Sequence, residues 1–230
     1  MAFRNVAAYR KEVGNEVDLC LEFHRRMTPS EAIVLINELA QFRPYFCEDP
    51  TKPDNFESME YIAGKVTVPI ATGERLHTPQ EFQQLISRRA VDYVRPDVCM
   101  CGGITGAKKI AAIAEANDIL VVPHNPLSPV STSACLQIAA SIPNFGLLEY
   151  PGDDRVSCTD RYISNIFDDT GFRQGEIVKK QYVYENGYIK VPTSAPGLGI
   201  ELVENAETIF PYQRRVMATR LHVDGSVVDQ

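Results

Sequence analysis

Residues 120–129, LVVPHNPLSP, contain the pattern on which the predicted fold depends. An apolar, β-branched run typical of a buried strand ends in a histidine, His124, which stands between Pro123 and Pro126. The prolines restrict the backbone around the imidazole, as they would in a plain turn or beside a positioned functional group. His124 is therefore either a packed core histidine or a group held in place for chemistry.

The same kind of run recurs along the chain about every 25 residues. Strands are predicted over 16–23, 44–50, 68–74, 91–99, 119–125 and 145–151. Segments with helical spacing lie between them or follow them, over 28–42, 54–66, 78–90, 105–118 and 131–142, and Thr28 before Pro29 is the expected N-cap of the first. Apolar strands separated by helices indicate a parallel sheet, either a barrel or a doubly wound sheet.

One ionisable residue stands near the carboxyl end of every predicted strand. The separations between these residues are 26, 26, 23, 27 and 25, and the residues are Glu22, Glu48, Glu74, Asp97, His124 and Glu149. A barrel collects functional side chains at the carboxyl ends of many strands, whereas an open sheet binds ligands mainly at one crevice. Because a ring of negative charge repels itself unless a cation lies among it, the pattern predicts a barrel with a metal at its mouth.

Glu22, Glu48 and Glu74 are the expected metal ligands. An all-oxygen set favours Mg²⁺ over Zn²⁺. In the competing interpretation, Glu48 and Asp49 cap the following helix and Glu74 pairs with Arg75.

Asp97 and His124 lie on adjacent predicted strands, so their side chains can meet. A carboxylate on one ring nitrogen fixes the tautomer and leaves the other nitrogen to accept a proton, which makes His124 a candidate general base. His24 lies two residues after Glu22 and would face the same way on a strand, where it could donate a proton to a leaving group. Its competing interpretation is a histidine of a surface loop.

Composition limits the class of protein. The 230-residue chain is 44% hydrophobic and carries a formal charge of −7, so it is expected to fold around a sizeable core and to bind neither nucleic acid nor an anionic membrane. It shows no signal peptide or membrane span, and a cytoplasmic location is expected. The six cysteines are expected to be reduced core residues: Cys20, Cys47, Cys99, Cys101, Cys135 and Cys158.

An ordered set of motifs resembles the enolase superfamily, and within it the sugar-acid dehydratases of the mandelate racemase subgroup. The motifs are EDP (48–50), GER (73–75), RPD (95–97), GGITGAKKIA (102–111), PHNP (123–126) and LEY (148–150). The resemblance spans roughly residues 5–205. It implies a modified (β/α)7β barrel with a separate capping domain, and the dehydration of an aldonate such as galactonate to a 2-keto-3-deoxy acid.

The resemblance also implies roles for individual residues. Glu22, Glu48 and Glu74 match the Mg²⁺ ligands, and Asp97 and His124 match the dyad whose histidine removes the α-proton. His24 matches the acid that protonates the departing 3-hydroxyl, and Glu149 matches a glutamate that helps bind the substrate carboxylate. An epimerase or racemase of hydroxy acids is the alternative within the family. An inactive truncated barrel that serves in binding or assembly is the alternative outside catalysis.

Two features depart from the family pattern. Glu22 stands where Asp is common, and only about one helix precedes it, so the capping domain and the first barrel strands are expected to be absent. We expect an incomplete α/β barrel of about six strands over 1–151, and an extension over 152–230 with a hairpin at ENG (185–187). Homo-oligomerisation is expected. The chain is a fragment, a truncated gene product or half of an assembly, and the sequence leaves all three explanations open.

Overall fold

The computed structural model describes residues 1–126, 128–150, 177–180, 182, 184–209, 211–212 and 225. The chain divides into two compact units. The first comprises Met1–His124 and Ser141–Leu148, and the second comprises Asn125–Ala140 and Glu149–Gln230.

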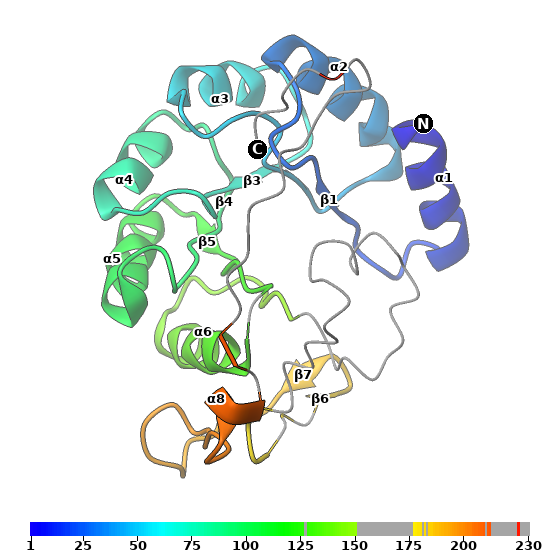
Figure 1. Cartoon of the computed structure of the whole chain (residues 1–230). Helices are drawn as coiled ribbons and strands as arrows, with labels where there is room; N and C mark the ends of the chain where they lie inside the picture. The colour runs from blue at the N-terminus through cyan, green and yellow to red at the C-terminus, as the bar shows by residue number, and fades with distance from the viewer. Residues whose placement is uncertain are drawn as a thin grey trace. The chain divides into compact units, whose positions relative to one another are not determined.

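The first unit alternates strands with helices, as the sequence predicts. Its elements are α1 (Ala2–Val13), β1 (Cys20–Glu22), α2 (Pro29–Leu39), η1 (Ala40–Phe42), β2 (Phe46–Glu48), α3 (Phe56–Ala63), β3 (Ile70–Thr72), α4 (Pro79–Ser87), β4 (Tyr93–Val94), α5 (Gly103–Glu115) and β5 (Leu120–Val121). Within the described residues, the strands form one sheet in the order β1-β2-β3-β4-β5, with every pairing parallel. Helices α2 to α5 follow the outer side of this sheet (Figure 1). The unit is therefore a curved, parallel βα array.

The register of the sheet brings the carboxyl ends of the strands to one edge. Glu22 at the end of β1 is the direct partner of Glu48 at the end of β2. Farther along the sheet, Asp97 and His124 form an isolated parallel bridge beyond the ends of β4 and β5. Because parallel strands in sequential order all point the same way, their terminal side chains gather on one side of the array.

The strand predicted over 145–151 is much shorter than expected. Phe145 forms an isolated parallel bridge with Val121, and 146–150 lie outside any strand. Val121 N donates to Asn144 O and Gly146 N donates to Val121 O, and these two bonds form the bridge. The Asn144 side chain instead donates to the carbonyls of Ala111 and Ile119, which ties this segment to α5 and to the start of β5.

Helix starts agree with the sequence signals. The Thr28 side chain accepts from Glu31 N and the Glu31 side chain accepts from Thr28 N, a capping box ahead of Pro29 that confirms the expected N-cap. Thr78 and Glu81 form the same arrangement at α4. Such caps satisfy amide groups that have no partner within a helix.

The core lies between the strands and the helices around them. Helical side chains supply most of it, and the fully buried ones include Ile36, Leu39, Ile62, Phe82, Leu85, Ile86 and Ile110. On the opposite face of the sheet, Phe46, Ala71 and Val122 form a smaller buried cluster beside Tyr45 and Tyr93. Since Phe46 and Glu48 are two residues apart on β2, they share this inner face. The inner cluster therefore lies below the polar strand ends.

Gly73 sets the turn that carries Glu74 away from β3. Its φ is 138°, and an added Cβ would lie 2.6 Å from the ring of the fully buried Phe82. We expect Gly73→Ala to lower the free energy of unfolding by about 1–3 kcal/mol, because both the backbone and the packed ring must shift. Denaturant unfolding of the purified chain measures this, with Gly64→Ala as the control at a negative φ. An unchanged midpoint for Gly73→Ala would contradict the packing argument.

In the second unit, helix α6 (Pro129–Ser141) precedes a hairpin of β6 (Tyr184–Glu185) and β7 (Tyr188–Ile189) and a short helix α8 (Ala206–Ile209). Asn186 and Gly187 have φ of 52° and 82°, the left-handed pair that a tight hairpin turn requires. The predicted hairpin at ENG is thereby confirmed. The boundary predicted at 151/152 falls at the edge of 151–176, which lie outside the described residues, and that division stays a prediction.

The cysteines do not all lie in the core. Cys47, Cys101 and Cys135 are buried and free, as expected. Cys20 and Cys99 are free but exposed, so the prediction of a core position was wrong for both of them. Cys20 lies at the start of edge strand β1, where nothing in the described sheet pairs with its outer side. Cys158 lies outside the described residues.

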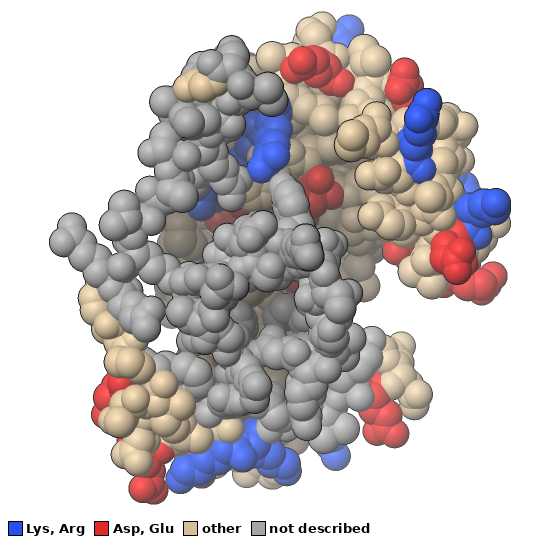
Figure 2. Space-filling view, turned by 45° about the vertical axis from the view of Figure 1, so that its right-hand side comes forward, with Lys and Arg blue, Asp and Glu red and all other residues tan. Residues whose placement is uncertain are grey.

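The surface carries both signs of charge. Figure 2 shows acidic and basic side chains on the same face of the described residues, together with a larger area of uncharged ones. Among the described helices, none is both long and apolar enough to cross a bilayer.

Candidate metal and acid–base site

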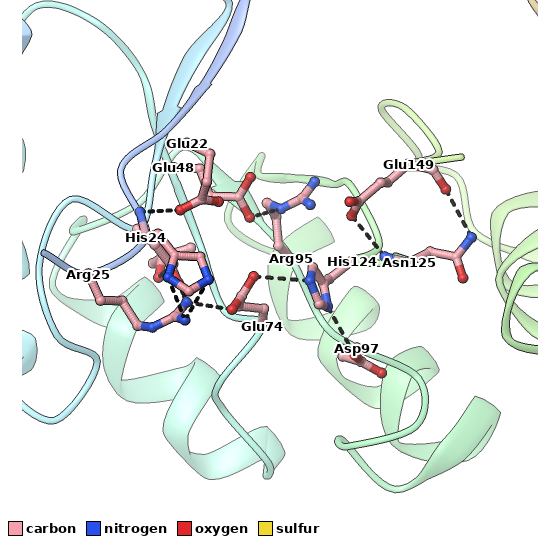
Figure 3. A network of polar contacts seen from close by, with 12 residues as sticks. Glu22, His24, Arg25, Glu48, Glu74, Arg95, Asp97, His124, Asn125 and Glu149 are labelled. Atoms are coloured by element: carbon pink, nitrogen blue, oxygen red, sulfur yellow. Dashed lines mark hydrogen bonds and ion pairs between the residues drawn. The ribbon is translucent and has the colours of Figure 1, made fainter. Parts of the chain in front are cut away.

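Three carboxylates converge at the strand ends of the first unit. Glu22 ends β1, Glu48 ends β2, and Glu74 follows β3 after the turn at Gly73. One oxygen from each of these glutamates lies within 4.8 Å of the other two (Figure 3). Glu48 and Glu74 are buried and Glu22 is exposed. The structure thus brings together all three residues that the sequence predicts as metal ligands.

The donor set suits a hard divalent cation. Mg²⁺ binds oxygens at about 2.0–2.1 Å and Ca²⁺ at about 2.3–2.6 Å, so oxygens on opposite sides of one ion lie about 4–5 Å apart. That separation is the upper limit for two ligands of one ion, and the three carboxylate oxygens lie within 4.8 Å of one another. Carboxylate oxygen is also the ligand that these ions prefer over softer sulfur or nitrogen donors. Glu22, Glu48 and Glu74 therefore fit a magnesium-type ion.

Each carboxylate is also held by a donor of the protein. Glu22 accepts from the backbone amide of His24, and Glu48 accepts from Arg95 Nε. Glu74 accepts from Arg25 NH1 through one oxygen, and its other oxygen lies 3.0 Å from His124 Nε2. Separate donors therefore orient the three carboxylates.

The pKa values of Glu22 and Glu74 shift in opposite directions. Withdrawal from water, followed by the charges of Glu48, Asp49 and Glu74, raises the pKa of Glu22 well above its ordinary value. Solvent still reaches this strand end, which limits the size of the rise. Burial also acts to raise the pKa of Glu74, but the hydrogen bonds and charges of His124 and Arg25 outweigh it and lower that pKa to about 2. Glu22 is thus the carboxylate least compensated by protein cations.

His124 lies between two carboxylates. Its Nδ1 is 2.9 Å from Asp97 Oδ2, and its Nε2 faces Glu74. Asp97 is buried and its other oxygen accepts from Cys99 N at 2.7 Å, which fixes the carboxylate. Because Asp97 can only accept from Nδ1–H, the tautomer with hydrogen on Nδ1 leaves Nε2 toward the carboxylate cluster. In this structure both ring nitrogens therefore face carboxylate oxygens, and it is the neutral ring, with its hydrogen on Nδ1 beside Asp97, whose Nε2 can accept a proton.

His24 reaches the cluster by a turn and not by strand alternation. Strand β1 ends at Glu22, and His24 and Arg25 follow with φ of 54° and 63°. The argument that His24 shares a strand face with Glu22 was therefore wrong. Two successive left-handed residues other than glycine cost about 1–2 kcal/mol each, so contacts elsewhere must hold the turn.

Glu149 belongs to the second unit, where it contacts Asn125. Its Oε2 accepts from Asn125 N at 2.8 Å, and its carbonyl accepts from Asn125 Nδ2 at 3.0 Å. Asn125 Nδ2 also donates to Thr132 Oγ1 at 2.9 Å, which ties the pair to α6. A role for Glu149 in binding a substrate carboxylate stays a prediction.

The competing interpretations of the glutamates do not match these contacts. Glu74 pairs with Arg25 and His124, whereas the competing interpretation expected a pair with Arg75. Helix α3 is capped by Asn55, whose side chain accepts from Ser58 N, and not by Asp49.

Sequence reasoning missed the buried arginines and Asp49. Arg95 and Arg25 are 4% and 6% exposed, and each contacts an expected metal ligand. Arg95 also lies over the ring of Phe46. Asp49 is 2% exposed and accepts from Thr72 Oγ1. Their positions directly beside or after the strand ends are the signal that could have revealed them, because a charge at a buried position requires a partner.

The chain resembles known proteins over nearly all of its length. The family described as Enolase C-terminal domain-like matches residues 1–206. A D-galactonate dehydratase family member from Streptomyces bingchenggensis is 34% identical over 98% of this chain and 51% of that protein. A D-galactonate dehydratase from Verminephrobacter eiseniae is 32% identical over 99% of this chain and 57% of that protein.

Solved structures give the same result. An enolase from Agrobacterium radiobacter, bound to sodium and L-malate, aligns with a TM-score of 0.84 and 28% identity over 98% of this chain and 56% of that one. A mandelate racemase/muconate lactonizing enzyme-like protein from Roseovarius sp. TM1035 aligns with a TM-score of 0.74 and 34% identity, covering 87% of this chain and 46% of that one. The chain spans about half the length of these relatives. Its motifs, its parallel βα array and these matches together show that the chain belongs to the enolase C-terminal domain-like family.

Proposed function

We propose that this chain carries the metal-binding and acid–base groups of a Mg²⁺-dependent sugar-acid dehydratase, a hydro-lyase that converts an aldonate such as galactonate to a 2-keto-3-deoxy acid. The observation that carries the proposal is the convergence of Glu22, Glu48 and Glu74 beside the Asp97–His124 pair. Relatives named D-galactonate dehydratase support this choice of reaction class and substrate.

Glu22, Glu48 and Glu74 would hold the Mg²⁺ ion. When bound, the ion stabilises the negative charge that develops on the substrate carboxylate as the adjacent carbon loses its proton. The protein groups around it, Arg25 and Arg95, keep Glu74 and Glu48 oriented toward the centre of the cluster.

His124 acts as the general base. Nε2 takes the proton from the carbon next to the substrate carboxylate, while Nδ1–H donates to Asp97 and holds the ring in place. The electron pair of the broken C–H bond moves onto the carboxylate and then forms a carbon–carbon double bond as the β-hydroxyl departs. His24 gives the proton that lets this hydroxyl leave as water, and the resulting enol ketonises.

A single assay separates this reaction from its alternatives. We expect the purified chain, given Mg²⁺ and a panel of aldonates, to form 2-keto-3-deoxy acids that are detected as semicarbazones, and EDTA to stop product formation. Epimerised acid without keto product would indicate the epimerase or racemase reaction instead. A folded chain that binds Mg²⁺ and leaves every acid unchanged would contradict catalysis and favour a role in binding or assembly.

A further inference from the structure

Arg25 lies at the centre of contacts that join the His24 turn to the metal-ligand cluster. Its NH1 donates to Asp49 Oδ2 at 2.8 Å and to one oxygen of Glu74. Its NH2 lies 3.3 Å from Nδ1 and 3.2 Å from Nε2 of His24. Figure 3 shows the guanidinium directly beside the His24 ring and Glu74. One buried cation thus contacts the proposed acid and an expected metal ligand at the same time.

Both the backbone and the side chain of Arg25 are fixed to the neighbouring strands. Arg25 N donates to Asp49 O at 2.7 Å, and the Asp49 carboxylate accepts from both Arg25 NH1 and Thr72 Oγ1, the latter at 2.6 Å. Asp49 and Thr72 are buried residues at the ends of β2 and β3. Arg25 is therefore attached to buried groups at the carboxyl ends of these two strands.

The backbone of the turn needs this attachment. His24 and Arg25 both adopt left-handed φ values, which are unfavourable for residues with a Cβ. The side-chain contacts of Arg25 with Asp49 and Glu74 help to hold the turn in this form, together with the backbone bonds from Arg25 N to Asp49 O and from His24 N to Glu22 Oε1. Without the Arg25 side chain, the His24 ring loses the guanidinium beside it and is expected to move away from the carboxylate cluster.

We propose that Arg25 is a positioning residue that holds the His24 ring beside the carboxylate cluster. The inference rests on the proposed function, because the position of His24 matters for catalysis only if His24 is the acid of the proposed dehydration. Arg25 does not act on the substrate itself. It acts through His24, and we expect its contact with Glu74 to affect the proton abstraction by His124 less strongly.

The first test needs neither metal nor substrate. Crystal structures of the metal-free chain are compared for wild type, Arg25→Met and Arg25→Lys, with Arg26→Met as the control because Arg26 is the exposed arginine next in the chain. We expect the His24 ring to move away from its position beside the carboxylate cluster in Arg25→Met and to stay in place in Arg26→Met. A His24 ring that keeps its position in Arg25→Met overturns the proposal.

The second test separates positioning from a general loss of structure. In D₂O, exchange of the substrate α-proton reports His124, and formation of keto acid reports His24. Arg25→Met is expected to lower the ratio of dehydration to exchange at least about 10-fold, and Arg25→Lys, which keeps the charge, to recover part of it. An equal loss of both activities in Arg25→Met would overturn the proposal. A wild-type chain inert to aldonates would contradict the dehydratase function alone, and the crystallographic comparison would still decide the position of His24.

Discussion

His124→Asn is expected to abolish both α-proton exchange and dehydration, whereas His24→Asn is expected to abolish dehydration alone. General bases and acids contribute about 10²–10⁴-fold to rate, so each affected step should fall by at least about 10²-fold. The difference arises because the two imidazoles act in successive steps. His124 contacts Asp97 and faces the cluster with Nε2, and His24 lies on the turn after Glu22 beside Arg25.

The measurement is one incubation with aldonate and Mg²⁺ in D₂O, followed by NMR. Loss of the α-proton signal gives the exchange rate, and the methylene signals of the 2-keto-3-deoxy acid give the dehydration rate. His77→Asn is the matched control, because His77 is an exposed histidine in the turn before α4. The assignment of base and acid is wrong if His24→Asn loses exchange as fully as His124→Asn does.

Glu22→Gln and Glu74→Gln are expected to weaken metal binding alike, but only Glu74→Gln is expected to destabilise the metal-free chain. A unit charge about 4 Å from another contributes about 4 kcal/mol at an effective dielectric constant of 20, so losing a carboxylate from a divalent site should weaken binding at least about 100-fold. Titration calorimetry with Mg²⁺ or Mn²⁺ measures this. EDTA treatment of the wild type should remove activity in the same way.

The stability of the metal-free chain separates the two glutamates. Glu74 pairs with buried Arg25 and with His124, so Glu74→Gln should destabilise the chain, toward the lower end of the about 3–5 kcal/mol typical of a broken buried pair, because Asp49 still contacts Arg25. Glu22 instead faces the like charges of Glu48, Asp49 and Glu74. Removing its charge should leave the metal-free chain as stable as wild type or more so.

The pH dependence checks the same argument. Because the pKa of Glu22 is raised in the folded chain, the folded state binds more protons than the unfolded state above about pH 4.5, and the contribution of Glu22 to stability falls as pH rises from there. We expect the free energy of unfolding, measured with urea in EDTA, to fall less between pH 5 and pH 8 in Glu22→Gln than in wild type. Destabilisation of Glu22→Gln equal to that of Glu74→Gln would contradict this account of the cluster.

Residue spacing was sufficient to predict the βα alternation and the residues that meet at the strand ends. Strand spacing alone brought Glu22, Glu48 and Glu74 into one set, because parallel strands in sequential order carry their last residues to the same edge. Capping signals such as Thr28 likewise depend on neighbours only three residues away. Such features need only local spacing and the direction of the chain.

The pairing of the buried charges, in contrast, depends on contacts between distant parts of the chain. Arg25 and Arg95 contact Glu74 and Glu48 across 49 and 47 residues, and no local pattern specifies such pairs. The left-handed turn that brings His24 to the cluster and the reduction of the last predicted strand to the bridge at Phe145 were also unreadable from spacing. These features share one cause. A buried polar group without a partner is costly, and the fold determines which partners lie within reach of it.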